Sequence, residues 1–170
     1  MTTIAFKDKI MASDSHIVGA YIDQLSADKI YQCGNFLIGC AGAVSDIKKF
    51  ISYIDNGWRE IDLPKEVVDT FEALAYDMSD GQLWYYDGSY TGVETGEISA
   101  IGSGQGFAMG AMLAGADASE AVAIASELDP YTGGEIKIYH LEEELEAPPE
   151  VEEPVSKTKK NKKKKHGKDS

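Results

Sequence analysis

The chain has 170 residues, of which 43% are hydrophobic and 26% charged, and its formal net charge is −13. This length suits one domain with a hydrophobic core. An acidic chain disfavours nucleic acid or an anionic membrane as the main ligand of its folded part, and no apolar run reaches the roughly 18 residues that a membrane-spanning helix needs.

The charges divide the chain into a body and a tail. Residues 142–153 hold seven Glu and no base, and residues 157–170 hold eight Lys and one Asp, so residues 1–141 keep eight bases and 21 acids. The tail has no apolar period and cannot bury enough surface to become ordered. We expect one folded domain over residues 1–145 and a disordered, acidic and then lysine-rich tail over residues 146–170. The lysines could contact nucleic acid or a membrane surface, or remain solvated beside the acidic body.

The first part of the chain predicts two hairpins. Strands Thr3–Phe6 and Ile10–Ser13 are joined at Lys7-Asp8-Lys9, and a mixed connection follows over residues 15–27. Strands Lys29–Cys33 and Phe36–Ala41 form the second hairpin. Its second strand is apolar almost throughout, which indicates burial on both faces.

The two cysteines flank the turn of the second hairpin at Gly34-Asn35. In such a hairpin Cys33 would face Phe36, and Cys40 would lie near Lys29, so we expect no disulfide between them. A reduced, cytoplasmic protein is the simplest interpretation.

The chain then changes to a helical period. A helix over residues 44–56 is predicted by apolar residues at i, i+3, i+4 and i+7, with Ser45 or Asp46 as its cap and Asn56-Gly57 as its stop. The apolar residues are Ile47, Phe50, Ile51 and Ile54. A second helix is predicted over residues 64–76, with Val67, Val68, Phe71, Leu74 and Ala75 on one side.

The second part alternates groups of strands with a further helix pair. We expect strands at Leu83–Tyr86, Tyr90–Val93 and Ile98–Ile101, a glycine-rich loop over residues 102–106, helices at Phe107–Leu113 and from Asp117, and a last strand at Glu135–Tyr139. Asp117 and Glu120 form a capping-box pattern, and Ala121, Ile124, Ala125 and Leu128 are expected to be buried. Helix pairs between groups of strands indicate an α+β sandwich rather than a doubly wound sheet.

The chain begins Met1-Thr2-Thr3-Ile4, and we expect no secretory signal or propeptide ahead of Thr2. Threonine is small enough for a cytosolic aminopeptidase to remove Met1. Thr2 would then carry a free α-amine beside its own hydroxyl, which places a nucleophile and a base on one residue. Taken alone, this start is typical of an ordinary first strand.

A series of short segments along the chain carries a family resemblance. In chain order these are Thr2-Thr3-Ile4, Ala12-Ser13-Asp14-Ser15, Lys29, Gly39-Cys40-Ala41-Gly42, Gly102-Ser103-Gly104 and residues 129–134, Asp-Pro-Tyr-Thr-Gly-Gly. Together they resemble the proteasome β-subunit family of N-terminal-nucleophile threonine peptidases, and the bacterial HslV-type peptidase looks most similar. The last segment is nearer the proteasome pattern than the HslV one. The resemblance spans nearly all of residues 2–141 and implies a four-layer αββα sandwich, in which helix pairs flank two antiparallel sheets.

The resemblance implies a nucleophile and its activating groups. Thr2 Oγ would attack the scissile carbonyl, and its α-amine, with a reference pKa of about 7.7–8, would be the general base through a water. Lys29 looks like the cation that lowers the pKa of this amine, and Asp14 like the carboxylate that holds Lys29. An ordinary surface ion pair is the alternative. The segment up to Asp14 is shorter than is usual in the family, so the first hairpin must turn tightly at Asp8.

The remaining site residues also come from the resemblance. Gly42 matches the oxyanion-hole N–H, although an ordinary turn glycine would look the same. Ser103, Asp129 and Thr132 match residues that hydrogen-bond around the terminal amine; otherwise Ser103 could be a helix cap and Asp129 part of a plain turn. Val18 and Cys40 match the main substrate pocket. We expect His16 to be exposed and without a role.

The implied protein is a subunit of a self-compartmentalising ring protease. A homo-oligomeric double ring would enclose Thr2, so the substrates would be unfolded polypeptides and the partner a ring ATPase unfoldase, with no cofactor and no metal. The predicted helices at residues 44–56 and 64–76 are candidates for subunit contacts. Two alternatives stay open: a catalytically inactive structural homologue that retains Met1, and an N-terminal-nucleophile amidase acting on a small molecule.

Overall fold

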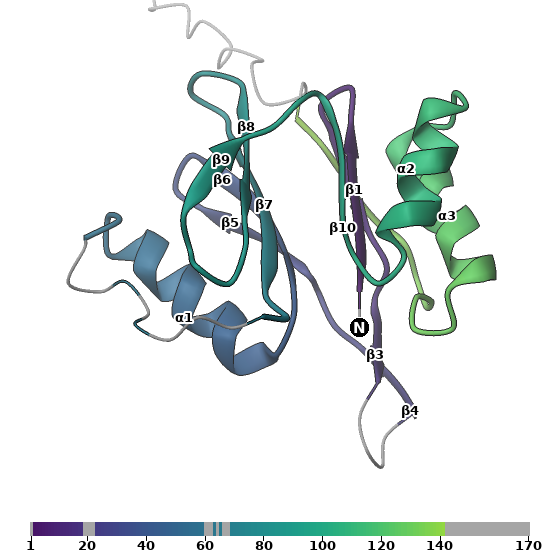
Figure 1. The fold of residues 1–170 in the computed structure, drawn as a ribbon, viewed down its shortest axis with the longest axis horizontal. Helices are drawn as coiled ribbons and strands as arrows, with labels where there is room; N and C mark the ends of the chain where they lie inside the picture. Colours follow the sequence, from purple (N-terminus) through teal and green to yellow (C-terminus); the bar gives the residue numbers. More distant parts are fainter. Residues whose placement is uncertain (1, 19–22, 60–62, 64, 66–68, 142–170) are drawn as a thin grey trace, which may run out of the picture.

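The fold is a four-layer sandwich (Figure 1). In this computed structural model, residues 2–18, 23–59, 63, 65 and 69–141 are described. Helix α1 (Val44–Asp55) covers one face, and helices α2 (Gln105–Leu113) and α3 (Ala118–Leu128) cover the other, with two antiparallel sheets between them. The α+β prediction is therefore confirmed, whereas Met1 and the expected tail over residues 146–170 lie outside the described residues.

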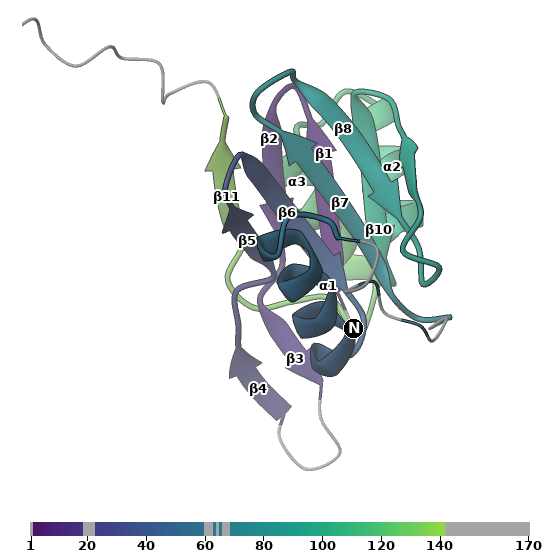
Figure 2. The same ribbon diagram turned by 90° about the vertical axis from the view of Figure 1, so that its left-hand side faces the viewer.

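Each sheet is antiparallel throughout. The sheet beside α2 and α3 has the order β10-β1-β2-β11, with β1 (Thr3–Lys7) and β2 (Ile10–Ser13) at its centre and β10 (Ile98–Gly102) and β11 (Lys137–His140) at its edges. The sheet beside α1 runs in chain order through β5 (Ile30–Cys33), β6 (Phe36–Ala41), β7 (Glu72–Asp77), β8 (Gln82–Tyr86) and β9 (Gly92–Glu94). The expected mixed connection contains a short ribbon of β3 (His16–Val18) and β4 (Asp23–Ser26), which projects at one end (Figure 2).

The first hairpin has the tight turn that the sequence requires. Lys7 pairs with Ile10, so Asp8 and Lys9 form a two-residue loop. Both have positive φ, 51° and 58°, which is the geometry of a type I′ turn and matches the twist of the flanking strands. This register places Asp14 directly after the end of β2, beside the start of β1.

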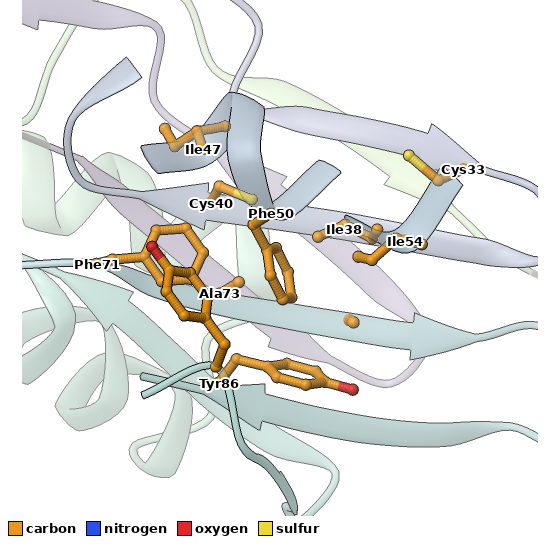
Figure 3. Packing of buried hydrophobic residues seen from close by; sticks show 11 residues of the cluster. Cys33, Ile38, Cys40, Ile47, Phe50, Ile54, Phe71, Ala73 and Tyr86 are labelled. Carbon is orange, nitrogen blue, oxygen red and sulfur yellow. The ribbon is translucent and has the colours of Figure 1, made fainter. Parts of the chain in front are cut away.

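Three apolar layers hold the sandwich together. In one layer, the apolar face of α1 packs Ile47, Phe50 and Ile54 onto β6, β7 and β8 (Figure 3). A second layer lies between the two sheets, and a third, rich in alanine, lies between the β1–β2 sheet and the α2–α3 pair. The capping box at Asp117 and Glu120 forms as predicted.

Details of two helices differ from the prediction. In α3 the alanines are buried, but Ile124 and Leu128 are 42% and 57% exposed, so their predicted burial is wrong. The side that faces the sheet carries small residues, because α3 packs closely against α2 and β1. In α1 the N-cap is Ala43, with no side-chain capping bond, rather than Ser45 or Asp46.

The helix predicted over residues 64–76 is wrong where the chain is described. Residues 72–77 form β7, a central strand between β6 and β8. Its side chains alternate: Ala73 and Ala75 face the α1 layer, whereas Leu74 and Tyr76 face the layer between the sheets. A strand buried on both faces is apolar nearly throughout, so its sequence can be mistaken for a helix. Val67 and Val68 lie outside the described residues. No helix in the described ranges combines the length and apolar character needed to cross a bilayer.

Candidate active site

Thr2 directly precedes β1 and is 6% exposed. Its carbonyl oxygen accepts a 2.8 Å hydrogen bond from the backbone N–H of Ser103. Gly102, with φ +90°, packs so closely that a Cβ there would overlap the carbonyl oxygen of Thr2. Glycine is therefore required at the end of β10, and this strand fixes the backbone position of Thr2.

Lys29 and Asp14 form a buried ion pair beside this position. The two residues are 6% and 0% exposed, and Lys29 Nζ lies 2.8 Å from Asp14 Oδ1. The Asp14 carboxylate also accepts hydrogen bonds from the backbone N–H groups of Thr3, His16 and Gly133, at 2.8, 3.3 and 3.2 Å. Lys29 Nζ donates a further bond of 2.7 Å to the His16 carbonyl. The shortened hairpin thus brings Asp14 to Lys29, and the surface ion pair considered as the alternative is excluded.

Burial sets the protonation tendency of Lys29. Desolvation lowers the pKa of its ammonium below the ordinary value, and the hydrogen bond and charge of Asp14 oppose this without cancelling it. The Asp14 carboxylate is held by backbone N–H groups from separate segments of the chain. Because its donors belong to the backbone rather than to flexible side chains, it holds the Lys29 ammonium in a fixed position. The arrangement supplies a fixed positive charge at the wall of the cavity that contains Thr2.

A second polar network approaches Thr2 from the other side. Asp129 Oδ2 accepts bonds of 2.6 Å from both Ser103 Oγ and Thr132 Oγ1. Because the single hydroxyl proton of Thr132 goes to Asp129, Thr3 must donate in the 2.6 Å contact between the Thr3 and Thr132 hydroxyls. Burial raises the pKa of Asp129, but these bonds and one from the Tyr131 N–H outweigh it, so the pKa is lowered. All three residues predicted around the amine are thus brought together next to Thr2.

Two cavities meet at Thr2. One, of about 220 Å³, is lined by residues that include Lys29, Cys40 and Ile47; the other, of about 310 Å³, is lined by residues that include Glu72 and Ser103. Cys40 is fully buried, and burial raises the pKa of its thiol, which makes it inert as a nucleophile. Cys33 and Cys40 are both free, as expected. The side chain of Val18 lies outside the described residues.

Besides Thr2, both cavities have Gly42 among their described lining residues. Its φ is +131°, and a Cβ there would lie 2.9 Å from the carbonyl oxygen of Thr70. Any side chain would thus strain the backbone and collide with the neighbouring chain. The position fits a backbone N–H donor that must be approached closely. In the part of the chain that is described, no three His, Cys, Asp or Glu residues gather where they could hold a metal ion.

Four residues of this site are not predicted from the sequence. The expectation that His16 is exposed is wrong: it is half-buried, lines the cavity with Lys29, and its carbonyl holds the ammonium. Thr3 and Gly133 are sequence neighbours of predicted site residues, Thr2 and Thr132. Their own part in the site is not visible in the sequence, because their hydrogen bonds join positions more than 100 residues apart. Glu72 is missed because residues 64–76 are predicted as a helix. Had residues 72–77 been predicted as a strand, Glu72 would have stood at the start of a central strand, beside Gly42.

Comparisons with known proteins support the architecture. A scan against protein-family models finds no match, and neither does a search of curated protein sequences. Among solved structures, the chain is similar to eukaryotic HslV from Trypanosoma brucei, with 22% identity and a TM-score of 0.64 over 81% of this chain and 98% of that one. It is also similar to Thiobacillus denitrificans BPH, with 18% identity and a TM-score of 0.57 over 81% and 95% of the two chains. A structure of that protein in complex with epoxomicin matches likewise, with 18% identity, a TM-score of 0.58, and 81% and 96% covered. The chain has the fold of the proteasome-type N-terminal-nucleophile hydrolases.

Proposed function

We propose that this chain is a threonine-type endopeptidase subunit whose nucleophile is Thr2, once Met1 has been removed. The observation that carries the proposal is the position of Thr2: its backbone is held by Ser103 at the point where two cavities meet, with the buried Lys29–Asp14 pair in the wall of one of them. A plain first strand would need neither a buried ammonium nor cavities on both sides of its first residue.

The chemistry would be an acyl transfer in two stages. Thr2 Oγ forms a bond to the scissile carbonyl carbon while its proton passes to the α-amine of Thr2, through a water. The backbone N–H of Gly42 hydrogen-bonds the resulting oxyanion. The C–N bond then breaks as the α-ammonium gives its proton to the departing amine. Water attacks the ester that remains, which releases the second product and restores the Thr2 hydroxyl.

The two polar networks have separate tasks in this mechanism. The positive charge of Lys29 lowers the pKa of the nearby α-amine and favours negative charge developing on Thr2 Oγ, and Asp14 keeps that charge in place. Ser103 and Asp129, with Thr132, surround the amine from the other side and orient its proton. Cys40 lines the cavity that contains Lys29, and its fully buried, uncharged thiol keeps the base of this substrate pocket apolar.

The assembly and its partners are part of the same proposal. The subunits would form a homo-oligomeric double ring in the cytoplasm that encloses Thr2 and receives unfolded polypeptides from a ring ATPase unfoldase. The sequence resemblance and the fold shared with HslV support this. The outer faces of α2 and α3 carry exposed apolar side chains, Phe107, Leu113, Ile124 and Leu128, which is typical of surfaces that are covered in an assembly.

The decisive experiment is covalent labelling of the processed protein. A peptide epoxyketone should bridge the hydroxyl and the α-amine of Thr2 in a ring adduct, which intact-mass and peptide mass spectrometry would locate. We expect one adduct, on Thr2, that is absent from Thr2→Ala. Protein shown to lack Met1 and still forming no adduct would overturn the proposal. Retention of Met1 in the natural protein would favour an inactive homologue, and a monomer or dimer by native mass spectrometry would count against the ring and favour a small-molecule amidase.

A further inference from the structure

The cavity of about 310 Å³ beside Thr2 has a chemical character of its own. Besides Thr2 and Gly42, its walls include Thr70, Glu72 and Ser103. Among the described residues that line it, Glu72 carries the single formal charge, whereas the other cavity at Thr2 has both Lys29 and Asp28 in its wall. A carboxylate with no cation beside it in the described lining therefore distinguishes this cavity from the other one.

Glu72 is fixed in place but keeps capacity to bind a cation. It begins β7, is half-buried, and accepts a 2.9 Å hydrogen bond at Oε2 from the N–H of Gly102 and a 3.2 Å bond at Oε1 from the Tyr85 hydroxyl. A carboxylate offers about four lone-pair positions, so each oxygen can accept one more donor. Burial first, and then the charge and the hydrogen bond of Glu72, raise the pKa of the Tyr85 hydroxyl.

The position of Ser103 indicates which side of the scissile bond this cavity receives. The amine that leaves must lie close to the Thr2 α-amine, which gives it a proton. Ser103, which the proposed mechanism places beside the α-amine, lines this cavity, and its hydroxyl donates to Asp129. The departing half of the substrate is thus directed towards Glu72, and the half that becomes the ester is directed towards Lys29.

We propose, on the basis of the proposed function, that this cavity binds the residue that follows the scissile bond and that Glu72 makes it selective for lysine or arginine there. A cationic side chain of the departing half would reach the Glu72 carboxylate in a half-buried setting, where an ion pair is stronger than on an open surface. Glu72 is a specificity residue in this scheme and takes no part in bond making.

The test uses the full chain without Met1 and internally quenched peptides that differ only in the residue after the scissile bond. That residue is lysine, or norleucine, which has the same carbon stem without the ammonium; mass spectrometry verifies the cleavage position. Glu72→Gln keeps an oxygen that can accept from Gly102, and Glu94→Gln makes the same change on β9, outside the lining of this cavity. The readout is the ratio of kcat/KM for the two peptides within each variant, which cancels any general loss of activity.

We expect the wild type and Glu94→Gln to favour the lysine peptide by about fivefold to tenfold, with a ratio that falls as salt is added, and Glu72→Gln to show a ratio near one. A ratio near one in the wild type, or an undiminished ratio in Glu72→Gln, would overturn the inference. Epoxyketone labelling distinguishes failure of this inference from failure of the proposed function. An adduct on Thr2 without lysine preference would refute the selectivity of Glu72 and leave the proposed peptidase activity standing. Absence of both adduct and cleavage would refute the proposed function and the inference together.

Discussion

The Lys29–Asp14 pair allows the catalytic and the structural roles of one contact to be separated. Lys29→Met keeps most of the side-chain volume but removes the charge. Asp14 would retain its three backbone N–H donors, from Thr3, His16 and Gly133. The variant loses the bonds of Lys29 to Asp14 and to the His16 carbonyl, and each hydrogen bond to a charged group contributes about 1.5–3 kcal/mol to the free energy of unfolding.

Asp14→Leu removes the other partner with a larger expected effect. Lys29 would lose the carboxylate that compensates its buried charge, which costs about 3–5 kcal/mol. The three backbone N–H groups would lose their acceptor as well, at about 1–3 kcal/mol for each that water cannot reach. The order of stability should thus be wild type, then Lys29→Met, then Asp14→Leu.

Urea unfolding followed by circular dichroism measures this order, and epoxyketone labelling measures the chemistry. Lys29→Met should fold but label Thr2 about 10²-fold more slowly or worse, since a preorganised charge at the reacting oxygen is lost. Lys7→Met is the control: this partly buried lysine bonds the carbonyls of Met112 and Ala116, so its loss should lower stability and leave labelling intact. Labelling of Lys29→Met at the control rate, or a more stable Asp14→Leu than Lys29→Met, would refute the reasoning.

Further predictions concern the site backbone, its acid stability and the core. Gly42→Ala meets the Thr70 carbonyl and a positive φ, so it should cost at least about 1 kcal/mol and slow labelling. Gly57→Ala, also at positive φ but with open space, should cost less and label normally in the same assays. The lowered pKa of Asp129 means that its stabilisation is complete above a pH of about 4 and is lost as pH falls through the folded-state pKa. Urea midpoints from pH 2.5 to 6 should thus fall less steeply for Asp129→Asn than for the wild type; equal slopes would contradict this. Phe50→Ala, at a fully buried ring, should lose about 3–5 kcal/mol in urea unfolding, and a loss below about 1 kcal/mol would contradict the packing.

The parts of the fold that could be predicted are those in which local sequence and tertiary context agree. Helix α1 shows its period because only one face is buried, and the turn at Asp8-Lys9 follows from the short segment between two strands. Strand β7 could not be predicted in the same way. Its alanines and leucine favour a helix locally, and only the strands on both sides, β6 and β8, make an extended conformation better.

The site shows the same division between local and distant information. Asp14, Lys29 and Gly42 lie in short segments that can be recognised one by one. The network that joins Thr3 to Thr132 spans 129 positions in sequence, and no spacing rule connects them. Thr2, Gly42 and Ser103 in the wall of the cavity of about 310 Å³ are predicted from the sequence, but its carboxylate, Glu72, is not, because the strand that carries it is predicted as a helix.

The contacts around Thr2 also bear on how the site matures. The carbonyl of Thr2 is bonded by Ser103, and the next residue, Thr3, is fixed through its N–H by Asp14 and through its hydroxyl by Thr132. Each of these contacts comes from chain that follows Thr2. These contacts fix the backbone at Thr2 and Thr3 from chain that follows them, so under the proposed function removal of Met1 would supply an amine beside groups that are already in place. Cleavage of one peptide bond would then act as a chemical switch that needs no rearrangement of the fold, so the processed and unprocessed chains should differ in reactivity far more than in stability.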